Sequence, residues 1–309
     1  MQRTLKREVS CKNIGLHSGR KVGMTIKPAG VDEGIVFVRR DVNGKNRIKA
    51  HWDNVSDTTL ATTIGNNGTV ISTIEHLMSA LCGTGIDNAV VEVDTHEIPI
   101  MDGSALPFVN LLKEVGTVAQ GKRKKFLVVN KEVSVSDQAG TASLLPASEF
   151  KITYKIDFPH PLIGQQSYEM VFTSDRYEKE IAPARTFGFL KDVEYLQAKG
   201  LALGGSLKNA VVLDEKKIIN KEGLRFHDEF VKHKILDAIG DLSLLGMPIV
   251  GHFVAYKSGH RLNNTLLRQL LKNEENCSIV DDSDQSAFEQ RRRSLKDRGY
   301  RILHAIRAV

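Results

Sequence analysis

Four residues in two separate segments have side chains that can bind a divalent metal and use it in catalysis. His233 and Asp237 are four residues apart in a segment of helical pattern, so an imidazole and a carboxylate would lie side by side on one face. His76, on an earlier helical segment, would complete a three-ligand site with one position left for water, the arrangement of catalytic zinc. Glu75 precedes His76 and points about 100° away around the helix, where it can take a proton from that water. The pattern predicts a zinc-dependent hydrolase whose site is assembled from two halves of the chain.

Each segment also has an ordinary structural interpretation. A lone histidine such as His76, on a mostly apolar helix, is usually a hydrogen-bonded core residue. Glu75 stands three residues after Ser72, which fits a capping box at a helix start. A polar sector of a helix is usually exposed to solvent, and the second helix has such a sector, made of His233, Lys234, Asp237 and Asp241. One metal site would explain both helices, whereas the ordinary interpretations need a separate reason for each.

His260 follows an apolar strand in a predicted tight turn that contains Ser258 and Gly259. Histidines in turns are commonly just exposed. If this turn faces the metal, His260 is a candidate general acid, because imidazole titrates nearest to neutral pH. Asp241 can hold the ring and favour its cationic form through its opposite charge.

Hydrophobic patterning predicts the elements that must position these residues. In the first half we expect strands at 35–38, 69–71 and 89–93, a helix from about 72 to 83, and a second helix at 105–115. In the second half we expect strands at 126–129, 132–136, 150–158 and 249–256, and helices at 229–245 and 263–273. The repeated order predicts an α+β fold with two similar domains, 1–121 and 126–275, each a mostly antiparallel sheet with helices on one face. The helices of both would pack between the two sheets, and a basic tail, 276–309, would follow.

Composition narrows the class of protein. The chain has 309 residues with 41% hydrophobic and 26% charged residues, which is ordinary for a soluble globular protein. No segment approaches the roughly 20 apolar residues of a membrane span, and the start lacks the apolar core of a secretory signal. Three scattered cysteines fit a reducing compartment, so we expect a cytoplasmic location without membrane insertion. The net charge of +6 lies largely in Lys122–Lys125 and Arg291–Arg293, which are most simply solvated. There is no Walker lysine motif, GxSxG or HExxH, which argues against nucleotide-driven phosphoryl transfer and serine hydrolysis.

Six segments together resemble a known family. They are 14–19, 71–77, 97–104, 184–189, 233–241 and 257–260, and they occur in the family's order between about Arg3 and Asn273. The family is UDP-3-O-acyl-N-acetylglucosamine deacetylase, the zinc amidase that commits Gram-negative bacteria to lipid A synthesis. The basic tail falls outside the resemblance; it is expected to be a peripheral helix or, through its apolar end 305–309, a degradation signal.

The resemblance implies a role for each candidate residue. Zinc, one ion per chain, would be bound by His76, His233 and Asp237, with Glu75 as general base. Thr186 would stabilise the oxyanion together with the metal. His260, held by Asp241, would protonate the leaving amine or stabilise the charge on the intermediate. Lys234 would contact the sugar or phosphate region of the substrate. The nucleotide side would be held by Phe187, Phe189 and Asp192, and a passage for the acyl chain would be lined by Val193, Leu201, Ala202, Gly205 and Ser206.

The resemblance also implies the partners. The expected substrate is a nucleotide-sugar lipid, and we expect a monomer that binds no nucleic acid. Two rival readings remain: a zinc N-deacylase for another amino sugar, and a non-enzymatic basic α+β protein that binds nucleic acid. From pattern alone, the glycine-bearing insert between 184 and 206 can equally be a pocket lining or a packed crossover.

Overall fold

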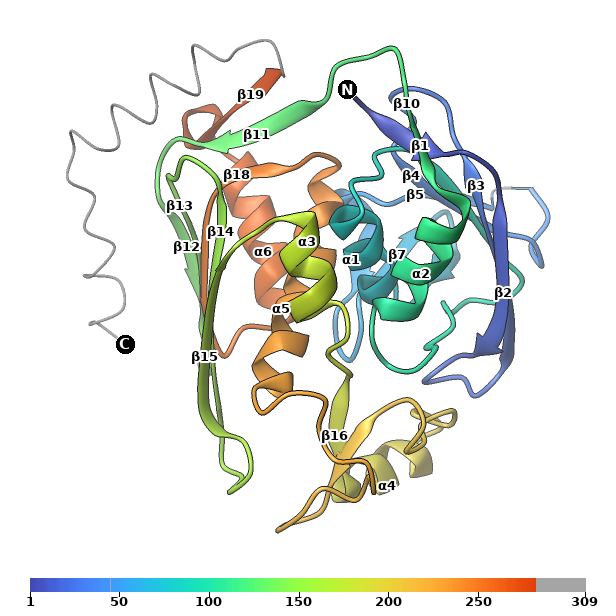
Figure 1. Ribbon diagram of the computed structural model, residues 1–309, viewed down its shortest axis with the longest axis vertical. Coiled ribbons are helices and arrows are strands. Elements are labelled where there is room, and N and C mark those ends of the chain that lie inside the picture. The colour runs from blue at the N-terminus through green and yellow to red at the C-terminus, as the bar shows by residue number, and fades with distance from the viewer. Residues whose placement is uncertain (45, 282–309) are drawn as a thin grey trace.

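The computed structural model describes residues 1–44 and 46–281, and it shows two α+β halves that face one another (Figure 1). Each half contains a mostly antiparallel sheet, and the main helices of both halves lie between the two sheets. The α+β architecture predicted from the sequence is confirmed. Among the described residues, no helix is both long enough and apolar enough to cross a membrane.

The first half is organised around a five-stranded sheet of order β2-β3-β9-β4-β5, in which only the β4–β9 pair is parallel. A three-stranded sheet, β6-β7-β8, and the pair β1–β10 complete it. The strands are β1 Arg3–Leu5, β2 Val9–Ile14, β3 Lys21–Pro28, β4 Ile35–Arg39, β5 Arg47–Lys49, β6 Val55–Asp57, β7 Thr63–Asn66, β8 Thr69–Ile71, β9 Ala89–Val93 and β10 Thr117–Ala119. The helices are η1 Trp52–Asn54, α1 Glu75–Gly83 and α2 Leu106–Val115.

The second half is built on a seven-stranded sheet in which β18 pairs with β11, β13 and β14. Its strands are β11 Lys125–Val129, β12 Val133–Ser136, β13 Thr141–Leu145, β14 Phe150–Phe158, β15 Gly164–Val171, β18 Ile249–Tyr256 and β19 Cys277–Asp281. Its helices are α3 Ser174–Arg176, η2 Tyr177–Ile181, α5 Glu229–Leu242, η3 Ser243–Leu245, α6 His260–Leu271 and η4 Glu274–Asn276. Because β19 pairs along the whole of β11, this sheet reaches residue 281, past the expected boundary at 275. The remainder of the predicted tail, 282–309, lies outside the described residues.

Helix α5 is the element that positions most of the candidate site. The predicted helix at 229–245 is confirmed as α5 continued by η3, and Gly246 ends it with a left-handed φ of 77°. Both sides of α5 are buried, including the polar sector that contains His233, Asp237 and Asp241. That sector therefore does not face solvent, and its charged groups require partners inside the protein.

Helix α1 packs along α5 between the sheets, and this contact joins the two halves. The two main chains approach closely at Gly240, where an added Cβ would lie 2.1 Å from the backbone oxygen of Glu75. Only glycine permits this approach of two main chains. The start of α1, which carries the first metal-binding candidate, is thereby held against the middle of α5.

A smaller unit projects from the second half between Ala184 and the start of α5 (Figure 1). It contains β16 Phe187–Phe189, α4 Leu190–Ala198 and β17 Val211–Leu213, with β16 and β17 parallel. Three backbone hydrogen bonds connect it to the first half: Thr186 N donates to Gly103 O at 2.7 Å, Leu203 N donates to His17 O at 3.1 Å, and Gly204 N donates to Leu16 O at 3.0 Å. This unit, residues 184–228, is called the insert below, and it contacts both halves at one end of the molecule.

Candidate active site

Three metal-binding candidates meet where α1 crosses α5. One potential ligand atom from each of His76, His233 and Asp237 lies within 4.8 Å of the other two. Asp237 Oδ1 is 3.5 Å from His76 Nε2 and 3.4 Å from His233 Nε2. The two imidazole rings are almost perpendicular, with centroids 5.0 Å apart. All three side chains are buried, so the cluster is enclosed within the protein.

The hydrogen bonds around this cluster leave the inward-facing atoms available for a cation. His233 Nδ1 donates to the Ala184 carbonyl at 3.0 Å, because a carbonyl can only accept, and His233 Nε2 therefore keeps its lone pair. Burial lowers the pKa of His233 to about 4, which favours the neutral ring that metals bind. Lys234 Nζ donates to Asp237 Oδ2 at 2.7 Å, leaving Oδ1 towards the imidazoles. Among the described residues, the buried Nδ1 of His76 has no hydrogen-bond partner.

Asp237 carries the negative charge that the cluster needs. Burial by itself would raise its pKa, but the neighbouring His233 and Lys234 outweigh burial and hold the pKa of Asp237 well below its usual range. Two imidazole nitrogens and one carboxylate oxygen form a donor set that suits zinc and related divalent metals. The residues present therefore fit a catalytic metal.

Glu75 is the first residue of α1 and is buried beside the cluster. Its Oε2 accepts a hydrogen bond from Thr62 N at 2.9 Å, and its Oε1 lies 4.0 Å from His260 Nε2. Burial raises the pKa of Glu75, which brings a carboxylate closer to the range of a general base. The predicted capping box is wrong: Ile74 is the residue before the helix, and it makes no side-chain capping bond.

His260 is the first residue of α6, so its predicted place in a tight turn is wrong by one element. Its Nδ1 donates to Asp241 Oδ2 at 2.9 Å. Asp241 also accepts hydrogen bonds from Thr62 Oγ1 at 2.5 Å and from Asn263 Nδ2 at 2.8 Å. Burial would lower the pKa of His260, but the adjacent Asp241 outweighs it and raises that pKa to about 9. The polypeptide alone therefore favours a protonated His260 at neutral pH.

This raised pKa predicts a specific pH dependence of stability in chelator-treated protein. Because the usual histidine pKa is 6.5 and that of folded His260 is about 9, its stabilising contribution is complete below pH 6.5 and is lost as pH rises through 9. The free energy of unfolding should therefore fall by roughly 2–3 kcal/mol more in the wild type than in His260→Gln over this range. Urea unfolding at pH 6, 7.5 and 9.5 measures it. His227→Gln, whose side chain is 94% exposed, serves as control, and identical slopes for the wild type and His260→Gln would contradict the assignment.

The first residues of the insert border the metal-binding cluster of His76, His233 and Asp237. Thr186 is held at its backbone, where its N–H donates to Gly103 O at 2.7 Å and its carbonyl accepts from Val211 N at 2.8 Å. The ring of Phe187 packs edge-on against Phe230 at 4.9 Å and lies 6.3 Å from the ring of His233. The ring contact with His233 places Phe187 beside the metal-binding cluster, and Thr186 directly precedes Phe187 in the chain.

The residues expected to line an acyl passage lie in the insert, whereas the metal-binding cluster lies on α1 and α5. Val193 belongs to α4, which has no buried residue and which also carries Asp192, the residue expected on the nucleotide side. Ala202 is buried, whereas Ser206 is exposed. Several large apolar side chains of this unit face solvent, namely Leu190, Tyr195, Leu203 and Leu207. The insert therefore has apolar surface that the remainder of the fold leaves uncovered.

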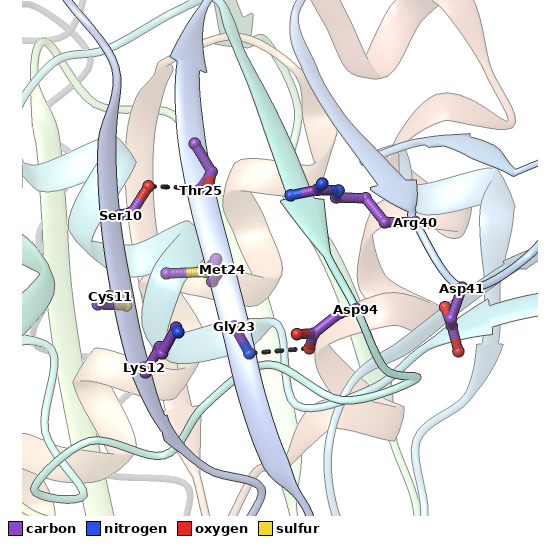
Figure 2. A pocket seen from close by; sticks show the side chains of 9 residues that line it. All are labelled: Ser10, Cys11, Lys12, Gly23, Met24, Thr25, Arg40, Asp41 and Asp94. Atoms are coloured by element: carbon purple, nitrogen blue, oxygen red, sulfur yellow. Dashed lines mark hydrogen bonds between the residues drawn. The ribbon is translucent and has the colours of Figure 1, made fainter.

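A separate concavity lies over β2 and β3, near the ends of β4 and β9 (Figure 2). Its polar contacts include Gly23 N donating to Asp94 Oδ1 at 2.8 Å. Burial raises the pKa of the Cys11 thiol to about 11, so this concavity offers no thiolate at neutral pH. None of the metal-binding candidates lines it.

Comparisons with known proteins assign the family. Residues 2–272 match the family described as UDP-3-O-acyl N-acetylglycosamine deacetylase. The chain belongs to this family. The resemblance predicted from the sequence is thereby confirmed.

Curated relatives named UDP-3-O-acyl-N-acetylglucosamine deacetylase support the same assignment over nearly the full length. The protein of Syntrophus aciditrophicus is 66% identical over 279 residues, 90% of this chain and 89% of the relative. That of Teredinibacter turnerae is 52% identical over 281 residues, 90% and 93% of the two chains. That of Myxococcus xanthus is 50% identical over 301 residues, 96% and 92% of the two chains.

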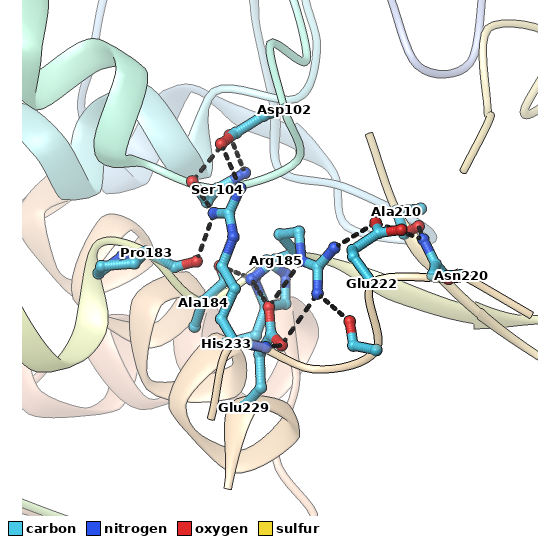
Figure 3. Close-up of polar contacts among 12 residues, drawn as sticks. Asp102, Ser104, Pro183, Ala184, Arg185, Ala210, Asn220, Glu222, Glu229 and His233 are labelled. Atoms are coloured by element: carbon cyan, nitrogen blue, oxygen red, sulfur yellow. Dashed lines mark hydrogen bonds and ion pairs between the residues drawn. The ribbon is translucent and has the colours of Figure 1, made fainter. Parts of the chain in front are cut away.

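A buried ion pair between Arg185 and Glu229 lies next to the metal-binding cluster, and the sequence analysis did not predict this pair. Figure 3 shows Arg185 and Glu229 next to the Ala184–His233 contact. Glu229 Oε1 accepts from Arg185 Nε at 2.8 Å and from Arg185 N at 3.0 Å, and Glu229 is completely buried. Because Ala184 precedes Arg185, the pair fixes the carbonyl that orients His233. An arginine and a glutamate 44 positions apart carry no local pattern that could have revealed this pairing.

Proposed function

We propose that this chain hydrolyses the acetamide of UDP-3-O-(hydroxyacyl)-N-acetylglucosamine and releases acetate, the committed step of lipid A biosynthesis. The observation that carries the proposal is the buried cluster of His76, His233 and Asp237, with Glu75 and His260 beside it. Membership of the deacetylase family supports the choice of an N-acylated nucleotide sugar. The proposed cofactor is one Zn²⁺ per chain, which would be held by His76, His233 and Asp237, since two imidazole nitrogens and one carboxylate oxygen suit a catalytic zinc.

The proposed mechanism follows from the protonation and position of each side chain. Bound zinc would supply a Lewis acid that polarises the amide carbonyl and lowers the pKa of water. Glu75 Oε1 accepts one proton from the attacking water while the new C–O bond forms. The hydroxyl of Thr186 donates a hydrogen bond to the developing oxyanion. When the C–N bond breaks, His260 Nε2 donates its proton to the leaving amine, and Asp241 holds the ring through Nδ1.

The substrate-binding assignments extend the same proposal outward. Lys234 is assigned to the sugar or phosphate region, and the nucleotide side to Phe187, Phe189 and Asp192. The acyl chain is assigned to a passage along Val193, Leu201, Ala202, Gly205 and Ser206. The exposed apolar side chains of the insert support this last assignment, since a fatty acyl chain would cover apolar surface. We further propose a cytoplasmic monomer, because every assigned residue belongs to one chain.

The first test measures acetate release from the nucleotide-sugar substrate with the zinc content quantified. We expect one zinc per chain in the wild type, and we expect His76→Ala to lose both zinc and acetate release. His227→Ala is the matched control, because its side chain is 94% exposed and should retain both. Stoichiometric zinc without acetate release would redirect the search to other N-acyl amino sugars, and protein that binds no zinc would overturn the proposal.

A further inference from the structure

Thr62 lies in the loop before β7 and is 2% exposed, and all of its polar groups bond to the elements that form the site. Its N–H donates to Glu75 Oε2 at 2.9 Å, and its hydroxyl donates to Asp241 Oδ1 at 2.5 Å. Its carbonyl accepts from Ile74 N at 3.3 Å. One residue of the first half therefore touches the start of α1 and the polar sector of α5 at once.

The bond to Glu75 distinguishes the two oxygens of that carboxylate. A backbone N–H is a fixed donor and it holds Oε2, so Oε1 is the oxygen of Glu75 that is better placed to take a proton from another group. Oε1 is also the oxygen that faces His260 Nε2, at 4.0 Å. Thr62 thereby determines which oxygen of Glu75 faces the imidazole.

The bond to Asp241 fixes the orientation of a second carboxylate. The terminal torsion of an aspartate side chain is broad, so one bonded oxygen alone leaves the carboxylate plane free to turn. In Asp241 the two oxygens are held from opposite sides: Thr62 binds Oδ1, while His260 and Asn263 bind Oδ2. Removing the Thr62 hydroxyl would leave Oδ1 without this donor and allow Oδ2 to rotate away from His260 Nδ1.

We propose that Thr62 is a positioning residue that sets the mutual orientation of the general base Glu75 and the general acid His260, the latter through Asp241. The effect of Thr62 on catalysis rests on the proposed deacetylase function. Thr62 is not one of the three metal-binding candidates, and it acts through its hydrogen bonds to Glu75 and Asp241.

The kinetic test uses Thr62→Val, which removes the hydroxyl and keeps the branched shape and the N–H. Loss of one buried hydrogen bond to a charged group predicts a fall in kcat of roughly 10- to 100-fold, with KM and bound zinc unchanged. Thr62→Ser should restore most of kcat because it restores the donor. Thr63→Val is the matched control, since that hydroxyl donates to Ser72 Oγ, outside this network. A Thr62→Val enzyme with wild-type kcat would overturn the proposal.

A double-mutant cycle separates positioning from a general loss of packing. If Thr62 acts through Asp241 on His260, the substitution Thr62→Val should cost less than roughly threefold in kcat when His260 is already glutamine. Equal losses in both backgrounds would show that the hydroxyl does not act through the imidazole and would overturn the assignment.

A spectroscopic test needs no substrate and so separates failure of this inference from failure of the proposed function. In histidine-labelled protein, the Nδ1–H resonance of His260 is identified by its loss in His260→Gln. We expect Thr62→Val to shift this resonance and Thr63→Val to leave it in place. If the resonance does not move in Thr62→Val, the positioning role is overturned whether or not the wild type releases acetate. If the resonance moves in Thr62→Val but the wild type releases no acetate, the positioning role stands and only the proposed substrate is refuted.

Discussion

Replacing Glu75 with glutamine is expected to lower kcat for acetate release by roughly two to four orders of magnitude. The carboxamide of the glutamine side chain cannot take the proton of the attacking water. The glutamine side chain keeps an oxygen that can accept from Thr62 N, so the local packing should persist. Glu75 is not among the residues that form the metal-binding cluster, and we therefore expect zinc content to remain at one per chain. Steady-state kinetics and metal analysis on the same preparation measure both quantities.

Glu92→Gln provides the control for this substitution. Glu92 lies on β9 and pairs with Lys27 at 2.8 Å near the surface. The substitution Glu92→Gln should therefore leave kcat unchanged. A Glu75→Gln enzyme within tenfold of wild-type kcat would remove Glu75 from the role of base. Loss of zinc together with activity would instead make Glu75 a metal ligand.

Replacing Arg185 with methionine is expected to lower the free energy of unfolding by about 3–5 kcal/mol, the range for breaking a buried ion pair on one side. Glu229 would stay completely buried and lose its guanidinium partner, whose Nε lies 2.8 Å from Glu229 Oε1. Because the segment that carries the Ala184 carbonyl would loosen, zinc affinity should also fall, by roughly 10- to 100-fold. Urea unfolding and competitive zinc titration measure the two effects.

Two further variants decide whether the burial of this pair is responsible. Lys179→Met breaks the exposed pair with Asp175, in which both side chains are about 70% exposed, and should leave the unfolding transition in place. Arg185→Met combined with Glu229→Met should recover much of the lost stability, since no unpaired buried charge remains. If the double variant is no more stable than Arg185→Met alone, the penalty does not come from an unpaired Glu229.

The parts of the fold that follow from local pattern were predicted well. The strands 150–158 and 249–256 have the predicted bounds, and the helix from 229 continues through η3 to 245. These elements were predictable because hydrophobic periodicity and a terminating glycine such as Gly246 depend only on residues that are neighbours in the sequence. The spacing of His233 and Asp237 likewise sufficed to place their side chains together on one face of a helix.

The parts that depend on the meeting of distant segments were not predictable in the same way. The hydroxyl of Thr62 bonds to Asp241 across 179 positions, and no local pattern distinguishes Thr62 from its neighbour Thr63. Exposure to solvent was the ordinary interpretation of the polar sector of α5, and the structure buries this sector instead, because sequence alone does not state what covers a helix. The capping-box prediction failed for the same reason: Glu75 is bound by Thr62 from another loop instead of by its own helix start.

Because of the contact between Gly240 and the Glu75 carbonyl, the conformational entropy of the site is lost when the chain folds and not when a ligand binds. Two main chains in direct contact leave no side chain whose rotamers could change the spacing of α1 and α5 at this point. The backbone spacing that separates His76 from His233 and Asp237 is therefore settled when the chain folds. Less conformational entropy then remains to be lost when a ligand arrives, and affinity is higher for the same set of donor atoms.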